Sequence, residues 1–303
     1  LLLEISTKGS FLMRQGRKVY LDLQTIGKIL KYTTLPQEVH HQILVNDEKL
    51  KKNGWPTSGH IILKNVTMKY GTDSCYLATK WNLEIKPGTK LALIGTTEFD
   101  HHCLIDKILR MREDASPDEA VIIDKINLKN IGTGFLRKHV CIIPQNSIIL
   151  TGTIRTNLDP YSHYPESKIW EVLEEVNLKS LVESLDKKLD TVITTDNKIL
   201  GPAERLLLHL ARGILWKSKV MMIDETTEHI SDSIDNYLQT KIEKCFSDST
   251  VITIAHRLTT VANYDRIIIL DKGRIIEDDS PYRLLVNKEG DTEITKPDGW
   301  FVR

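Results

Sequence analysis

The chain has 303 residues, of which 41% are hydrophobic and 27% are charged, so it can bury a sizeable core. Lys and Arg together number 41, as do Asp and Glu, and this neutrality argues against a nucleic-acid-binding protein. The scattered cysteines, with no C-x-x-C pair, predict neither a zinc site nor a disulfide framework. No apolar run approaches the roughly eighteen residues that span a bilayer. The chain opens on Leu1 without a signal peptide, so we expect it to belong to a longer protein.

Residues 1–35 are predicted to form a long helix. Val19, Leu23, Ile26 and Leu30 recur at helical spacing and fall on one face, and the helix ends before Pro36. Residues 36–59 are mostly polar and predict a linker.

The following segment predicts strands that lead into a glycine turn. Val66, Met68 and Tyr70 alternate along one strand. A turn at residues 87–88 precedes a strand over 90–94, which runs into Gly95 and a helix with Leu104, Ile108 and Met111 on one face. Strand, glycine turn and helix is the arrangement in which a phosphate-binding loop is found.

The loop itself departs from the G-x-x-x-x-G-K-[ST] pattern. Asp100, His101 and His102 stand where glycine, lysine and a hydroxyl residue are needed. The carboxylates of Glu98 and Asp100 would repel a phosphate by roughly 3–4 kcal/mol each before screening. His101 is mostly neutral near pH 7, and His102 offers no hydroxyl to Mg²⁺. We therefore expect weak or absent binding of ATP and magnesium.

Residues 219–225 contain four consecutive apolar residues and then Asp224 and Glu225. The run predicts a strand buried on both faces, with two carboxylates at its carboxyl end, where α/β sheets bind ligands. Asp224 can hold Mg²⁺ through water, and Glu225 can act as a base toward an attacking water. Taken alone, the run is more typical of a strand that stops at a solvated acidic turn.

Other patterns complete the expected elements. Ile169, Val172, Leu173 and Val176 keep helical spacing. Residues 266–270 and 274–277 predict a hairpin, residues 281–286 a short helix, and residues 291–303 a polar surface tail.

Several segments in order resemble the C-terminal nucleotide-binding domain of an ATP-binding cassette exporter of the multidrug-resistance-associated (C) subfamily. The most specific is Leu-Thr-Gly-Thr-Ile-Arg-Thr-Asn-Leu-Asp-Pro at 150–160. The others are residues 140–145, which resemble the strand before the Q-loop, 211–215, which resemble the helix after the signature, and 253–258, which resemble the switch-histidine segment.

The resemblance implies a P-loop NTPase-like α/β cassette over residues 60–290, with a mostly parallel core sheet, an antiparallel β subdomain and a helical subdomain. Residues 1–35 resemble the cytosolic end of the last transmembrane helix and the connector that follows it. By the same resemblance, Tyr70 stacks on adenine, while Gly95, Thr96, Thr97, Asp100, His101, His102 and Cys103 occupy the phosphate-loop positions. Gln145 and Asp224 match the magnesium ligands, Glu225 the catalytic glutamate, and His256 the γ-phosphate histidine.

The signature motif also departs from the family's consensus sequence. Leu200-Gly201-Pro202-Ala203-Glu204 stands where Leu-Ser-Gly-Gly-Gln is expected. Gly201 lacks the serine hydroxyl, Ala203 adds a methyl group and Glu204 adds a charge. Locally the segment still starts a helix well, with Gly201 as cap and Pro202 in the first turn.

Because of these departures, our first hypothesis is that the chain is a degenerate cassette. It would pair with the first nucleotide-binding domain of the same transporter and with its own transmembrane domain, at the cytoplasmic face of a membrane, while hydrolysing little ATP. The alternative is an active ATP-hydrolysing cassette, which Gln145, Asp224, Glu225 and His256 favour. A metal site at His101, His102 and Cys103 is disfavoured because adjacent residues on one turn seldom converge on one ion.

Overall fold

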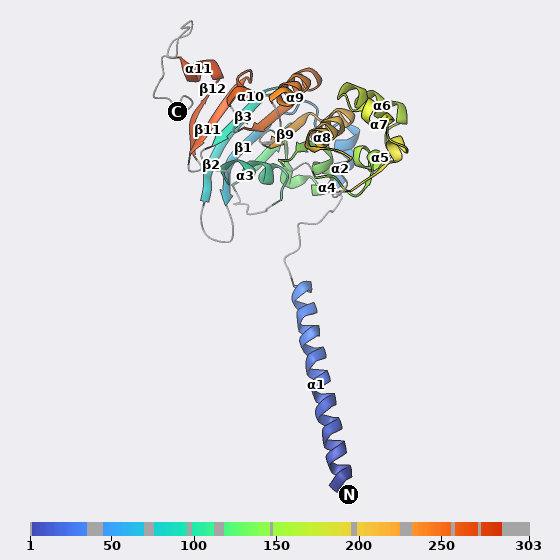
Figure 1. Ribbon diagram of the computed structural model, residues 1–303. Coiled ribbons are helices and arrows are strands. Elements are labelled where there is room, and N and C mark those ends of the chain that lie inside the picture. Colours follow the sequence, from blue (N-terminus) through green and yellow to red (C-terminus); the bar gives the residue numbers. More distant parts are fainter. Residues whose placement is uncertain are drawn as a thin grey trace. The chain divides into compact units, whose positions relative to one another are not determined.

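The computed structural model describes residues 2–34, 45–69, 76–95, 99–111, 118–145, 148–194, 199–224, 232–255, 258–271 and 274–286. Two compact units make up the chain, Leu1–His40 and His41–Arg303, and each is described by itself (Figure 1).

The first unit is the long helix α1 (Leu2–Thr33), as the sequence predicts. The predicted apolar stripe is uncovered in this chain, because Val19, Leu23, Ile26 and Leu30 are each more than half exposed. No helix in the described ranges combines the length and hydropathy that crossing a bilayer requires.

The second unit contains the remaining elements. Its helices are α2 (Val45–Lys52), α3 (Phe99–Ile108), α4 (Thr133–His139), α5 (Ile154–Leu158), α6 (Glu166–Glu175), α7 (Lys179–Glu183), α8 (Pro202–Trp216), α9 (Asp232–Cys245), α10 (Leu258–Val261) and α11 (Pro281–Leu285), with 3-10 turns at Leu128–Asn130 and Lys188–Asp190. Its strands are β1 (Ile61–Lys69), β2 (Tyr76–Ile85), β3 (Lys90–Gly95), β4 (Ala120–Ile123), β5 (Ile126–Asn127), β6 (Val140–Ile143), β7 (Gly152–Thr153), β8 (Val192–Ile193), β9 (Val220–Asp224), β10 (Thr250–Ile254), β11 (Arg266–Asp271) and β12 (Arg274–Asp279).

A six-stranded sheet forms the centre of this unit, in the order β12-β11-β3-β10-β9-β6. All neighbours are parallel except β12, which pairs antiparallel with β11 in the predicted hairpin. The run at residues 220–224 is the strand β9 and is buried throughout, as its unbroken apolar sequence predicts for a parallel strand covered on both faces.

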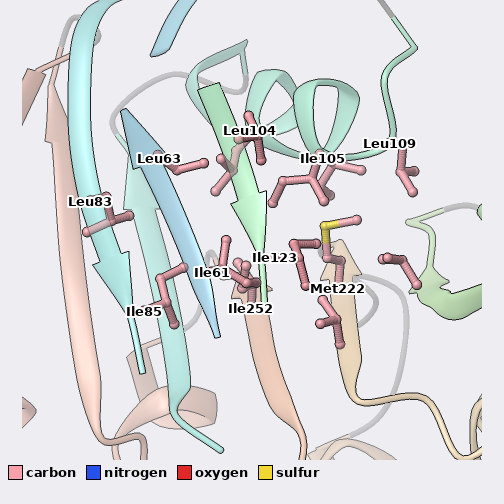
Figure 2. Packing of buried hydrophobic residues seen from close by; sticks show 14 of the residues in the cluster. Ile61, Leu63, Leu83, Ile85, Leu104, Ile105, Leu109, Ile123, Met222 and Ile252 are labelled. Atoms are coloured by element: carbon pink, nitrogen blue, oxygen red, sulfur yellow. The ribbon is translucent and has the colours of Figure 1, made fainter. Parts of the chain in front are cut away.

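The two faces of this sheet pack against different layers because side chains alternate along a strand. Val220 and Met222 share a core with β1, β2, β4 and α3, whereas Met221 and Ile223 share a core with α6 and α8. Figure 2 shows Leu104 and Ile105 of α3 in the same cluster as Ile123 and Met222. The antiparallel sheet β2-β1-β4-β5 therefore covers one face together with α3, and helices cover the other.

The helical subdomain that the sequence predicts lies beside α8, where α5, α6 and α7 gather at one end of the unit (Figure 1). Ile169, Val172, Leu173 and Val176 are at most 2% exposed, so their predicted helical stripe is confirmed as core.

The predicted linker is wrong over its second half. Residues 45–52 form α2, and Trp55 is 4% exposed and donates through Nε1 to the Ile123 carbonyl. Asp124 accepts backbone N–H groups from residues 57–60, which fastens this segment to β4. Gly59 is required here, because its φ is +78° and an added Cβ would lie 2.5 Å from the Lys219 carbonyl oxygen. The cassette thus begins before residue 60.

A second difference concerns the end of α3. Leu104 and Ile108 are buried as predicted, but Met111 is 53% exposed. The helix ends at Ile108 and Arg110 adopts a left-handed φ of 51°, so Met111 no longer follows the helical spacing.

Candidate functional site

The carboxyl ends of four neighbouring parallel strands meet at one edge of the core sheet. Ile254 of β10 pairs with Leu93 of β3 on one side and with Asp224 of β9 on the other. Ile143 at the end of β6 pairs with Ile223 of β9. Gly95, Asp224 and the residues that follow β6 and β10 are therefore brought to the same edge, which is where open α/β sheets bind ligands.

Both predicted magnesium ligands, Asp224 and Gln145, lie at this edge. Asp224 ends β9 and is 7% exposed, whereas Gln145 follows β6 by two residues and is exposed. Carboxylate and amide oxygens are hard ligands of the kind that Mg²⁺ prefers, so this pair fits the ion.

Several predicted site residues lie outside the described residues. Tyr70, Thr96, Thr97, Glu225 and His256 belong to this group. Their predicted roles stay predictions.

The residues that replace the phosphate-loop consensus lie in α3. Asp100, His101, His102 and Cys103 are within the first half of this helix, where only the backbone is described. Asp100 is the second residue of α3, in the first turn, whose N–H groups lack partners within the helix and therefore favour an anionic ligand. A residue that carries its own negative charge at this position opposes a bound triphosphate.

The signature segment forms the start of α8, as predicted. Gly201 is the N-cap residue, with φ −71° and ψ 176°, and Pro202 is the first helical residue. Gly201 provides no side-chain cap hydrogen bond. Leu200 is buried at 3% exposure and anchors the segment, whereas Ala203 and Glu204 are partly exposed.

Glu204 reaches back over this helix end. A Cβ built on Gly201 would lie 2.6 Å from the Glu204 Oε2 atom. The carboxylate therefore occupies the space beside the cap residue where the family's serine side chain would stand. An anion at this end interacts favourably with the helix dipole, so the protein supplies its own negative charge there. The residue types at the sheet edge are thus of the kind that holds Mg²⁺, whereas this helix end carries a carboxylate of the protein itself.

No group of three His, Cys, Asp or Glu side chains with metal-binding geometry occurs in the parts of the chain that the structure describes. The histidines and cysteine of the disfavoured metal hypothesis have side chains outside those parts.

A polar network that the sequence did not reveal joins α8 to the segment after Gln145. His209 Nε2 lies 3.1 Å from the Ile148 carbonyl oxygen. Asn157 accepts from the Leu150 N–H at 3.1 Å and donates to the Leu150 carbonyl at 2.9 Å. Arg212 donates twice to the Asn157 carbonyl, at 2.9 and 2.6 Å.

Burial controls the charge states in this network. Desolvation, with the nearby Arg212 charge, lowers the pKa of His209 to about 4, against the opposing effect of the Ile148 carbonyl. Desolvation also raises the pKa of the Cys141 thiol to about 12. His209 is therefore neutral at physiological pH and donates its Nε2 hydrogen to Ile148, and Cys141 is an unreactive core thiol.

A cavity of about 220 Å³ opens on another part of the cassette. It lies between α4 and the segment after α5, and aromatic residues make up much of its wall. The Lys138 ammonium lies 3.8 Å from the centre of the Tyr161 ring, and the His163 ring stacks on Tyr161 with centroids 5.6 Å apart. The cavity is lined by Lys51, Phe135, Lys138, His139, Asp159, Tyr161, His163, Tyr164 and Trp216.

A parallel α/β core with ligand-type residues at its carboxyl edge, an antiparallel sheet on one face and a helical subdomain defines a nucleotide-binding cassette of the P-loop class. Comparison with known proteins identifies the family, because residues 78–228 match the family model described as "ABC transporter". The chain belongs to this family.

The relatives are transporters of the C subfamily. The chain is 36% identical over 277 residues to ATP-binding cassette sub-family C member 4 of mouse and of human, covering 91% of this chain and 20% of each relative. It is 32% identical over 304 residues to the bile pigment transporter 1 of Saccharomyces cerevisiae, covering 94% of this chain and 19% of that relative. The chain therefore spans about a fifth of the length of the curated relatives that it matches.

Proposed function

We propose that this chain is a degenerate nucleotide-binding domain of an ABC exporter, which acts as the dimerisation and coupling partner of the first nucleotide-binding domain. It would bind ATP and magnesium weakly or not at all. Its own transmembrane domain would be its second partner, which places the cassette at the cytoplasmic face of a membrane.

The position of Glu204 carries this proposal. Its carboxylate lies over Gly201 at the start of α8, where a signature segment would receive a phosphate from the partner cassette. A phosphate approaching this end would meet a carboxylate, and two like charges about 4–5 Å apart repel by roughly 3–4 kcal/mol before screening. The signature half of a shared site is therefore weakened.

The start of α3 supports the same conclusion for the other half-site. Asp100 is in the first turn of the helix that follows the phosphate-loop position. Both helix ends that would face phosphates in a pair of cassettes thus carry an acidic residue of this chain. Even a net loss of about 4 kcal/mol would weaken nucleotide binding nearly a thousandfold.

A coupling role is supported by apolar surface close to the sheet edge. Ile148 and Leu150 follow Gln145 and are 63% and 65% exposed, and Tyr161, beside the cavity, is 49% exposed. Large apolar side chains that face solvent near a polar site favour burial by a partner. A transmembrane domain of the same transporter would supply that partner.

A second function, an active ATPase, is favoured by Asp224 at the carboxyl end of β9 with Gln145 after the neighbouring strand β6. Replacing Glu225 by Gln in the full transporter discriminates the two functions. A degenerate cassette predicts unchanged ATP turnover, because Glu225 would not act on a bound nucleotide. The equivalent substitution in the first cassette is the control and should abolish turnover. A large loss of turnover with Glu225→Gln would favour the active ATPase instead.

A further inference from the structure

The segment 148–150 is held at two successive points, by α8 at Ile148 and by α5 at Leu150. The Ile148 carbonyl accepts from His209, and the Leu150 backbone is bound through both its N–H and its carbonyl by the Asn157 side chain. His209 is 7% exposed and Asn157 is 2% exposed, so both hydrogen-bonding side chains are buried. Buried polar contacts of this kind fix one backbone path rather than several.

The fixed path determines which side chains of this segment face outward. Ile149 points into the core at 3% exposure, whereas its neighbours Ile148 and Leu150 are 63% and 65% exposed. A loop without these contacts could turn Ile148 or Leu150 inward and reduce its exposed apolar area. The network therefore maintains an outward orientation that the hydrophobic effect alone would not select.

We propose that His209 is a positioning residue, which holds residues 148–150 on α8 so that Ile148 and Leu150 form a preset apolar contact surface. The identity of the partner as the transmembrane domain rests on the proposed function. The positioning of residues 148–150 by His209 does not depend on the proposed function. Because α8 begins at Pro202, within the signature segment 200–204, the same contact would make the signature end and the segment after Gln145 move together.

The atom that acts is Nε2 of His209, and this permits a matched set of variants. The amide nitrogen of glutamine reaches about as far from the backbone as Nε2, whereas that of asparagine stops short. His209→Gln therefore keeps a donor for Ile148, and His209→Asn keeps the amide but loses the contact. His209→Phe fills the ring volume without a donor, which separates loss of the hydrogen bond from loss of packing.

The test is amide hydrogen exchange at Leu150 in the complete 303-residue chain. With His209→Asn and His209→Phe, we expect exchange at Leu150 to be about tenfold faster, because the end of the segment opens locally. With His209→Gln, it should stay within about twofold of the wild type, and exchange in β9 should be unchanged in all three. Equal exchange at Leu150 in the Asn and Gln variants would overturn the proposal.

A second readout addresses the partner. In the full transporter, His209→Asn should lower the amount of substrate moved per ATP hydrolysed severalfold, and His209→Gln should not. The exchange measurement involves neither nucleotide nor partner. Faster exchange at Leu150 with unchanged transport per ATP would therefore support the positioning role and contradict the coupling part of the proposed function.

Discussion

His209 shows how much one buried side chain contributes to this site. It lies on α8 among core residues, and its pKa is lowered to about 4 by burial and by the nearby charge of Arg212. The start of α8 was predictable from Gly201 and Pro202, because a proline one residue after a small cap residue is a local signal. The contact between His209 and Ile148 was not predictable, because it joins residues that are 61 positions apart.

The lowered pKa of His209 predicts a pH-dependent stability. The unfolded chain binds a proton at His209 near pH 6.5, but the folded chain does so only near pH 4. The stabilising effect of the neutral side chain is thus fully present above about pH 6.5 and is lost as the pH falls toward about 4, by up to about 3 kcal/mol. Urea unfolding at several pH values should show this loss in the wild type.

His209→Gln should remove that part of the pH dependence, because glutamine does not titrate. His163 is exposed, so His163→Gln is the matched control for replacing a histidine by glutamine. If wild type and His209→Gln lost stability equally between about pH 6.5 and pH 4, His209 would not be buried as a neutral group in the folded protein.

Helix α8 is closely packed whereas helix α1 is not, and the space around one glycine in each helix shows this difference. A Cβ on Gly213 of α8 would lie 2.9 Å from Met221 Cε, 3.0 Å from Cys141 Sγ and 3.2 Å from Phe246 Cζ. A Cβ on Gly27 of α1 would meet nothing within 4 Å. The same substitution should therefore have opposite effects in the two helices.

Gly213→Ala should lower the free energy of unfolding of the cassette by about 1–2 kcal/mol, because overpacking outweighs the better helix propensity of alanine. Gly27→Ala should leave the cassette unchanged and raise the helix content of α1, by up to about 1 kcal/mol of helix stability. Thermal unfolding and far-ultraviolet circular dichroism measure the two effects. A Gly213→Ala cassette as stable as the wild type would mean that α8 has room to move away from β9.

Lys90 joins β3 to the end of α9. Its ammonium donates to the carbonyl oxygens of Gly88, Phe246, Ser247 and Ser249 at 2.8–3.1 Å. Burial lowers its pKa, although the charges of Asp265 and Asp248 oppose this effect. The carbonyls of Phe246, Ser247 and Ser249 lie after the last helical residue of α9, where a cation is favourable.

Lys90→Met should lower the free energy of unfolding by about 3 kcal/mol, because the carbonyls lose a charged donor while methionine keeps the packing of the stem. Lys86 is exposed on the other side of the turn, so Lys86→Met is the matched control and should have no measurable effect. Chemical unfolding of both variants makes the comparison. Equal stabilities would show that water replaces the Lys90 contacts without cost.

The predictions of helices and strands succeeded where the local residue pattern determines the secondary structure. They failed where tertiary packing determines it. The strand β9 was predictable from its unbroken apolar run, and α6 from its helical spacing. Helix α2 was missed because residues 45–52 are mostly polar and lack a repeating apolar face. Only Trp55 in that region signalled a buried segment.

For the whole molecule, the sequence predicts which residues bear chemistry but not which of them meet. The strand order β3-β10-β9-β6 brings Gly95 and Asp224 to one edge, and this order is a property of the tertiary fold. The charge of Glu204 was visible in the sequence, whereas its position over Gly201 was not. That position gives a physical reason for the weak phosphate binding that we propose.

Titration of Mg-ATP into the chain, up to millimolar concentration, tests the proposed degenerate cassette most directly, because it measures binding at the chain's own phosphate loop. Tyr70→Ala is the control for adenine stacking, and the variant D100G/H101K/H102S restores the residue types of a phosphate loop. We predict that the wild type does not saturate below about 1 mM and is indifferent to Tyr70→Ala, and that the restored loop binds at least about tenfold more tightly. Micromolar binding by the wild type that Tyr70→Ala weakens would contradict the degenerate cassette.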